Sequence, residues 1–241
     1  MRNRLVAILL PGLSLLFLSF HPRATAKGKQ PLEGNSTLPA LISNPSSILY
    51  HALCLEEKGL SEKAFDYAYK GYHQLLSKNK IRNTRYLTVC DFSQSSRKKR
   101  LYVIDMENAE LVMQTYVAHG QNSGREFARR FSNKPSSLQS SLGFYVTKNT
   151  YKGEHGLALR MEGLEKGFND NALRRGIVIH GASYIGDEGM FNGSLTGRSF
   201  GCPAVPRKQN AAFIHLVKNG SCFFIYHPSQ NYLQRSKILN D

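Results

Sequence analysis

Acidic residues are scarce in this sequence: 17 Asp and Glu stand against 32 Lys and Arg, and the formal net charge is +15. This excess predicts an anionic partner, or else a lysine-rich surface that only keeps the protein soluble. Nucleic acid is not the expected partner, because the one dense basic cluster, residues 97–100, has no aromatic residues interleaved with it. Outside the cytoplasm, the remaining anionic partners are polymers and lipid surfaces of the cell envelope.

Long apolar runs are absent after residue 20, which argues against a protein with several membrane spans. Residues 5–20 form the one such run. Arg2 and Arg4 precede it and the small residues 24–26 follow it, which is typical of a cleaved export signal. A retained membrane anchor is the alternative, but the run is short for a bilayer span. We expect residues 1–26 to be a signal peptide and the protein to be exported to the periplasm or cell envelope.

Cysteine is also rare, with four residues at positions 54, 90, 202 and 222. In an oxidising compartment they could form two disulfides in three connectivities. If Cys202 is kept as a thiol, at most one bridge forms, and Cys54 with Cys90 is the pair we expect. Cys222 lies in an apolar run and is expected to be a small core residue of a strand.

The segment after the signal shows linker and helix patterns. Residues 27–45 are rich in Gly, Pro, Ser and Asn, which predicts a flexible linker. In residues 46–80, large apolar side chains recur at spacings of three and four, which predicts a helical hairpin with a buried face. We expect this helical segment to precede a domain that covers residues 81–241.

From residue 85 the pattern changes to short runs of β-branched and aromatic residues, such as 86–90, 101–105 and 111–117. Because long helices do not alternate with these runs, they predict a mainly β domain, a sandwich or a barrel. One helix is expected, at residues 207–218.

The residues that suggest chemistry are one histidine and one cysteine. His180 ends an apolar run and precedes Gly181, which places it where a strand meets solvent. Cys202 lies in Gly201-Cys202-Pro203, a tight turn that can present its sulfur together with backbone N–H groups. An imidazole that takes the thiol proton makes the thiolate available at neutral pH. A buried or disulfide-bonded Cys202 and a core His180 remain the structural alternatives.

These segments resemble the signature of the L,D-transpeptidase (YkuD-type) catalytic domain, in which a strand-end His-Gly precedes a Gly-Cys turn; here 21 residues separate His180 from Cys202. The resemblance is closer to the branch of murein L,D-transpeptidase catalytic domain family proteins, and it covers roughly residues 85–227. Five segments carry it: Val117-Ala118-His119-Gly120, Asn122-Ser123-Gly124, Gly156-Leu157-Ala158-Leu159-Arg160, Gly167-Phe168-Asn169-Asp170-Asn171-Ala172 and Ser199-Phe200-Gly201-Cys202-Pro203-Ala204-Val205.

The resemblance implies a β-sandwich or barrel of the L,D-transpeptidase type, with the N-terminal helical hairpin and a helix after Cys202. It implies a cysteine acyltransferase in which Cys202 forms a thioester with a peptidoglycan tetrapeptide stem and expels D-alanine. His180 passes the proton, and the N–H groups of Gly201 and Cys202 form the oxyanion hole. An amine of a second stem, or of an envelope lipoprotein, accepts the acyl group; if water accepts it, the protein is an L,D-carboxypeptidase. The chemistry requires no metal or organic cofactor.

Two departures from better-known members bear on the site. Those members carry a second histidine where this chain has Phe200, and an arginine where it has Pro203-Ala204-Val205. The second departure removes a candidate anchor for a substrate carboxylate. Arg198, Arg174 or Arg207 could take that role. The candidate substrate-binding residues are Ser199, Arg198, Tyr184, His119 and Arg174.

Three rival functions follow from the same residues. His180 and Asp187 share a spacing with zinc D,D-carboxypeptidases, but the closely spaced histidine pair that completes such a site is missing downstream. A papain-like peptidase would place its cysteine before its histidine, which is the reverse of the order here. A non-catalytic basic wall-binding protein would keep the fold, and its function would survive Cys202→Ala.

Overall fold

The computed structural model describes residues 44–154, 156–186 and 198–241. The chain divides into two compact units, Met1–Leu41 and Ile42–Asp241, and all described residues belong to the second. The predicted signal peptide and most of the predicted linker lie outside the described residues. Among the described helices, none has the length and apolar character that a membrane span requires.

Two helices open the described part, and they confirm the predicted helical hairpin. α1 (Pro45–Ala52) begins at Asn44, whose side chain accepts the Ser46 N–H. α2 (Glu62–Ser77) begins at Ser61, whose Oγ accepts the Ala64 N–H at 3.2 Å. The cap residues thus satisfy N–H groups that the first turn of each helix leaves without a backbone partner.

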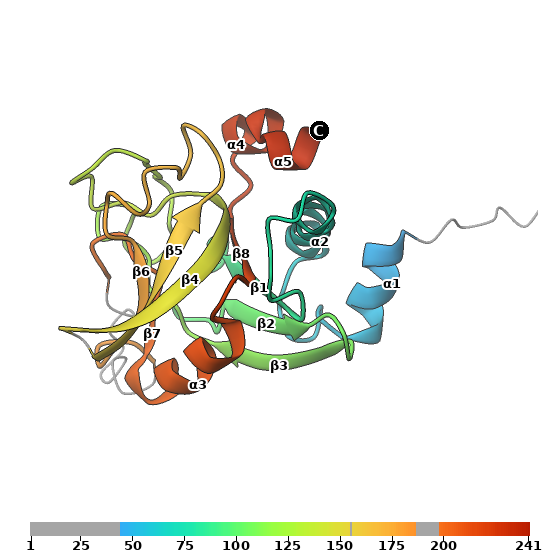
Figure 1. Ribbon diagram of the computed structural model, residues 1–241, viewed down its shortest axis with the longest axis horizontal. Helices are drawn as coiled ribbons and strands as arrows, with labels where there is room; N and C mark the ends of the chain where they lie inside the picture. Colours follow the sequence, from blue (N-terminus) through green and yellow to red (C-terminus); the bar gives the residue numbers. More distant parts are fainter. Residues whose placement is uncertain (1–43, 155, 187–197) are drawn as a thin grey trace, which may run out of the picture. The chain divides into compact units, whose positions relative to one another are not determined.

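Eight strands form one sheet in the order β3-β2-β1-β8-β4-β5-β6-β7 (Figure 1). Neighbours are antiparallel except for β1 with β8 and β6 with β7, which are parallel. The strands are β1 (Tyr86–Asp91), β2 (Leu101–Asp105), β3 (Glu110–Thr115), β4 (Gly143–Gly153), β5 (Gly156–Gly163), β6 (Val178–Ala182), β7 (Ala204–Pro206) and β8 (Cys222–Tyr226).

The two edges of the sheet meet through the segment that follows β3. The Ala118 N–H donates to the Ala204 carbonyl at 2.9 Å, and the Ser199 N–H donates to the His119 carbonyl at 3.0 Å. Gly120 and Ser199 form a parallel bridge. These contacts join the edge at β3 to the edge at β7, so the sheet is a nearly closed barrel and the predicted fold class is confirmed.

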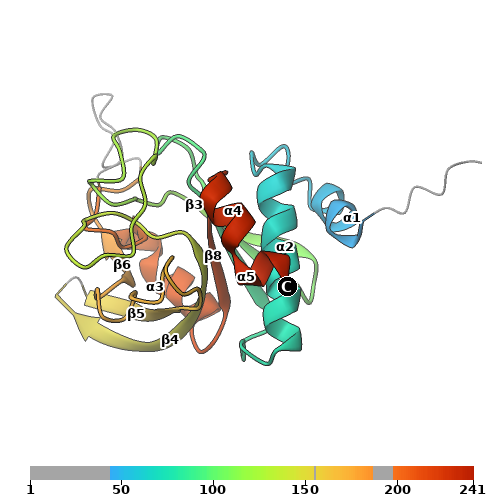
Figure 2. The same cartoon turned by 90° about the horizontal axis from the view of Figure 1, so that it is seen from above.

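The helical segment is part of the same core as the sheet. α2 packs on β1 and β8. Figure 2 shows α2 from above, on the side of the sheet where β8 lies. At Gly71 a Cβ atom would lie 1.9 Å from Phe144 Cζ, so the close approach of α2 to the sheet requires glycine there. Phe144 in turn stacks on Phe224 of β8, with ring centroids 4.1 Å apart.

Three helices lie in the last part of the chain. α3 (Arg207–Val217) follows β7 directly, packs on β6 and confirms the helix predicted after Cys202. α4 (Gln230–Arg235) and α5 (Lys237–Asn240) follow β8, and α5 packs on α2. β7 therefore runs from the cysteine turn into α3, which fixes the far end of that strand.

The disulfide prediction is wrong, because all four cysteines are free. Cys90 and Cys222 are fully buried in β1 and β8, whereas Cys54 is exposed. Cys222 is the core strand residue that its apolar neighbours predicted. Cys54 and Cys90 therefore do not form the expected pair, and sequence spacing does not show which cysteine is exposed and which is buried.

Candidate active site

Cys202 lies in a turn that leads into β7. The Ser199 hydroxyl donates to the Cys202 carbonyl at 2.6 Å and accepts the Gly201 N–H at 3.1 Å, so it fixes the turn from inside. Gly201 has a φ of +124°, and a Cβ atom there would lie 2.8 Å from the Gln139 carbonyl oxygen. The sequence Ser199-Phe200-Gly201-Cys202 therefore produces a turn that only glycine at position 201 allows.

His180 lies on β6, the strand next to that turn. In the parallel pairing of β6 with β7, His180 is opposite Ala204, two residues after Cys202. Its Nδ1 lies 3.3 Å from the Gly181 carbonyl oxygen, and because a carbonyl only accepts, Nδ1 carries the proton. The basic lone pair is then on Nε2, the nitrogen that can accept a proton.

The Cys202 side chain is a partly exposed thiol. Its Sγ is 3.7 Å from the Gly176 carbonyl, to which it donates. Burial raises the pKa of the Cys202 thiol, while a hydrogen bond from the Val178 N–H and the charge of Arg175 act in the opposite direction. A thiol in this state needs a base at the moment of attack, which is the role that a neighbouring imidazole can fill.

Arg175 lies behind the cysteine turn and was missed by the sequence argument. Its Nη2 is 3.2 Å from the position that a Cβ of Gly201 would take. Burial lowers the pKa of Arg175, and the nearby Tyr145 and Cys202 act to raise it. Its guanidinium donates to four oxygen atoms, namely the carbonyls of Ser132 (2.7 Å) and Gln139 (2.5 Å) and the hydroxyls of Ser137 (3.2 Å) and Ser141.

The neighbouring Arg174, which the sequence argument selected, is exposed. The sequence does not indicate which of two consecutive arginines before a strand faces the core. Arg175 connects the loop of residues 132–141 to the cysteine turn, and it is the cation that acts on the thiol.

His119 is fully buried, so its side chain has no exposed surface for a substrate. Arg100 Nη2 lies 2.7 Å from His119 Nδ1 and can only donate, so Nε2 carries the proton and faces the Gly124 carbonyl at 3.2 Å. Burial, followed by the charge of Arg100, lowers the pKa of His119 to about 4. Arg100, the last residue of the basic cluster 97–100, is itself fully buried and also donates to the Val117 carbonyl.

The other candidates are exposed to different degrees. Tyr184 is 42% exposed, and burial and then the negative charge of a Cys202 thiolate raise the pKa of its hydroxyl. Phe200 is 71% exposed directly beside the turn. Arg198 is exposed, and its charge acts on His119. Asp187, from the zinc hypothesis, lies outside the described residues.

Residues 56–226 match the family described as L,D-transpeptidase catalytic domain. The chain belongs to this family. The matched region begins within the α1–α2 connection and ends at the last residue of β8, so it contains α2 and the complete sheet. A comparison with curated proteins gives no match.

Two solved L,D-transpeptidase structures are similar to this chain. One is from Mycobacterium smegmatis, with 14% identity and a TM-score of 0.36, covering 59% of each chain. The other, residues 123–326 of a protein from Xylanimonas cellulosilytica, has 21% identity and a TM-score of 0.27, covering 52% of this chain and 55% of that one. The chain thus spans less than two thirds of either structure.

Proposed function

We propose that this L,D-transpeptidase family member is a peptidoglycan acyltransferase that works through a thioester on Cys202. The observation that carries the proposal is the position of the Cys202 turn, which enters the strand paired in register with the strand of His180. The family match over residues 56–226 supports the substrate class, peptidoglycan stem peptides. Export to the periplasm or cell envelope is part of the same proposal.

In the first step, His180 Nε2 takes the thiol proton as Cys202 Sγ attacks the carbonyl carbon of the third stem residue. The new C–S bond forms, and the C–N bond to the terminal D-alanine breaks. His180 returns the proton to the departing amine, so the imidazole is neutral again. Because the pKa of the resting thiol is raised, the proton transfer accompanies the attack and no stored thiolate is required.

The developing oxyanion needs N–H donors at the turn. In the described part of the chain, the Cys202 N–H has no hydrogen-bond acceptor, which suits it for this role. The Gly201 N–H already donates to Ser199 Oγ. We therefore assign the first donor to Cys202, and Gly201 contributes when its N–H turns away from the serine hydroxyl.

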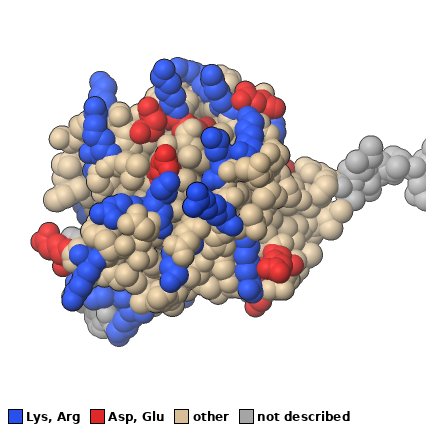
Figure 3. Space-filling model, in the orientation of Figure 1, with Lys and Arg blue, Asp and Glu red and all other residues tan. Residues whose placement is uncertain are grey.

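In the second step, an amine attacks the thioester carbonyl, a C–N bond forms and the C–S bond breaks. His180 takes the proton of the amine and returns it to the departing Cys202 sulfur, which restores the free thiol. A second stem peptide or an envelope lipoprotein supplies the amine in a transferase, whereas water in its place gives an L,D-carboxypeptidase. Tyr184 and Arg198, both exposed, are proposed to contact the stem peptide. Lys and Arg outnumber Asp and Glu on the face seen in Figure 3, and this positive charge favours binding to an anionic polymer.

Product analysis tests this function. The full chain is incubated with a disaccharide-tetrapeptide from the cell wall, and products are separated by chromatography and mass spectrometry. Cross-linked dimers with D-alanine release support the transferase, and tripeptides with D-alanine release indicate the carboxypeptidase. Retention on intact wall material with no D-alanine release contradicts both and favours the non-catalytic wall-binding protein.

A further inference from the structure

The backbone of the cysteine turn is tied down by hydrogen bonds at three of its four polar groups. The Gly201 N–H donates to Ser199 Oγ at 3.1 Å. The Cys202 carbonyl accepts the Ser199 hydroxyl at 2.6 Å and the Ala204 N–H at 3.0 Å. The Gly201 carbonyl accepts the hydroxyl of Ser140 at 3.3 Å. The Cys202 N–H is the fourth group, and it has no acceptor among the residues that the structure describes.

Ser140 is fully buried, and it comes from a segment that is distant in sequence from the turn. Its N–H donates to Ser123 Oγ at 2.9 Å, and its carbonyl accepts the Ser132 N–H at 3.0 Å. Its Oγ accepts the Gly120 N–H at 3.0 Å. Because a serine hydroxyl has one proton and the Gly120 N–H can only donate, that proton points to the Gly201 carbonyl.

The segment that carries Ser140 fits tightly between two glycines. A Cβ atom at Gly120 would lie 2.5 Å from the Leu138 carbonyl oxygen, and one at Gly201 would lie 2.8 Å from the Gln139 carbonyl oxygen. Leu138 has a φ of +56°, a conformation that residues other than glycine rarely adopt. The chain is therefore held in an uncommon backbone conformation that brings the Ser140 hydroxyl against the turn.

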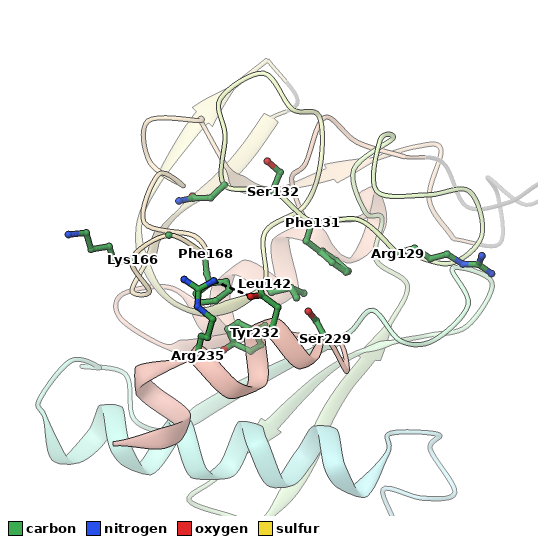
Figure 4. Close-up of a pocket in the computed structure, with 12 residues that line it drawn as sticks. Arg129, Phe131, Ser132, Leu142, Lys166, Phe168, Ser229, Tyr232 and Arg235 are labelled. Atoms are coloured by element: carbon green, nitrogen blue, oxygen red, sulfur yellow. Dashed lines mark hydrogen bonds between the residues drawn. The ribbon is translucent and has the colours of Figure 1, made fainter.

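The other side of this segment is held as well. Ser132, whose N–H binds the Ser140 carbonyl, lies in the wall of a cavity beside α4 (Figure 4). Arg175 donates to the Ser132 carbonyl at 2.7 Å and to the Gln139 carbonyl at 2.5 Å. The position of Ser140 Oγ is thus fixed before any substrate binds, which is the condition for a preorganised site.

The bond from Ser140 determines the direction of the unpaired N–H. The Gly201 carbonyl and the Cys202 N–H belong to one peptide unit, which is planar and trans, so the two groups point in opposite directions. A carbonyl held against the buried Ser140 hydroxyl therefore directs the Cys202 N–H away from Ser140. If this carbonyl were free to rotate, its oxygen could replace the N–H and repel a developing oxyanion.

We propose that Ser140 is a positioning residue for acyl transfer: it anchors the Gly201 carbonyl and thereby presents the Cys202 N–H to the oxyanion. The inference rests on the proposed function, which supplies the reaction. Ser140 contacts neither the substrate nor the thiol. It acts through the peptide unit that joins Gly201 to Cys202, and its effect is confined to steps in which an oxyanion forms.

Ser140→Ala tests the proposal through two reactions of the same thiol. Release of D-alanine from the disaccharide-tetrapeptide passes through an oxyanion, whereas alkylation of Cys202 by iodoacetamide displaces iodide at a saturated carbon and forms none. We expect kcat for release to fall about a hundredfold, as when an oxyanion-hole donor is lost, with KM almost unchanged. The rate and pH profile of alkylation, followed at Cys202 by peptide mapping, should stay those of the parent.

Two further variants complete the comparison. Ser221→Ala is the matched control, because it removes another fully buried serine hydroxyl, which donates to the Tyr86 carbonyl at 2.8 Å. It should lower the thermal unfolding midpoint and leave both reactions unchanged. Ser140→Cys keeps the size of the side chain with a weaker donor. It should lower release about tenfold with alkylation retained, and it takes the place of Ser140→Ala if that variant does not fold.

Three results would overturn the proposal. Release and alkylation that fall together would show that Ser140 only maintains the turn, and failure of both Ser140 variants to fold would show the same. An increase in KM with kcat retained would assign the loss to substrate binding. The parent chain is measured in parallel. Release by the parent and by a folded Ser140→Ala variant at equal rates rejects the role of Ser140 alone, whereas absence of release by the parent rejects the proposed function.

Discussion

Two His-Gly pairs follow apolar runs in this chain, and the structure gives them different surroundings. His119 is fully buried, with Arg100 on one ring nitrogen and the Gly124 carbonyl facing the other. His180 is on β6, in register with the strand that begins beside Cys202. The two segments lie on opposite sides of residues 199–204, because His119 accepts the Ser199 N–H through its carbonyl while His180 is opposite Ala204.

The difference shows that partners, and not the dipeptide, decide what a strand-end histidine does. Both nitrogens of His119 are engaged within the fold, and burial, followed by the charge of Arg100, lowers the pKa of the ring. This side of the cysteine segment therefore closes the barrel. The other side carries His180, opposite the strand that begins two residues after Cys202, and it is on this side that we propose proton transfer.

The largest effect is expected from removing the proposed base. His180→Gln should lower the rate of D-alanine release by about a thousandfold, as loss of a general base does. Its thermal unfolding midpoint should stay close to that of the parent. A rate within tenfold of the parent would contradict the assignment of His180.

The next effect concerns stability at the other histidine. The folded chain binds a proton on His119 with a pKa of about 4, against an ordinary value of 6.5. Below pH 6.5 the unfolded chain therefore takes up the proton first, so acid favours unfolding, and stability should fall by about 3 kcal/mol from pH 6.5 to pH 4. Denaturant unfolding at several pH values measures this slope.

His119→Gln is the control for this dependence of stability on pH, because the glutamine amide does not titrate. It should lower stability at pH 7 but lose much of the dependence between pH 6.5 and pH 4. An equal slope in parent and variant would show that other groups carry the acid sensitivity.

A smaller effect is expected at the glycine of the cysteine turn. Gly201→Ala places a Cβ atom 2.8 Å from the Gln139 carbonyl oxygen, so the turn must shift. A shift of about 1 Å in the sulfur lowers a rate by up to about a hundredfold. Gly156→Ala is the control, because Gly156 has a positive φ of +83° with nothing within 4 Å of the added atom. Equal rate losses in both variants would attribute the effect to backbone strain alone.

The smallest effect should appear in the titration of the thiol. Because the charge of Arg175 lowers the pKa of Cys202, Arg175→Gln should move the pH profile of iodoacetamide alkylation of Cys202 to higher pH. Arg175→Lys keeps the charge and should keep the profile nearer to that of the parent. Arg174→Gln changes the adjacent exposed cation and should leave the profile in place; the reverse pattern would restore the sequence-based choice.

Much of this fold follows from local patterns in the sequence. The apolar spacing in residues 46–80 predicts the two helices, the β-branched runs predict the strands, and the helix after Cys202 is visible in the same way. These features depend on neighbours in the chain. The closure of the barrel depends on pairing between the segment after β3 and residues 199–204, which are far apart in sequence and have no local signal.

In the candidate site, too, some features follow from the local sequence and others depend on tertiary packing. Gly201 and Ser199 belong to the Cys202 turn, so their local pattern indicates a special backbone. Arg175 reaches the turn through the loop of residues 132–141, and Arg100 is buried although it ends a run of four basic residues. Their positions are decided by tertiary packing, which sequence periodicity does not encode.

The most direct test of the account is a covalent one. The full chain and its Cys202→Ala variant are mixed with the disaccharide-tetrapeptide, quenched in acid within seconds, and examined by intact mass and peptide mapping. The account predicts an adduct on Cys202 equal to the substrate minus D-alanine, and none in the variant. Release of D-alanine by the variant, or an adduct on another residue, would contradict the assignment of Cys202 as the nucleophile.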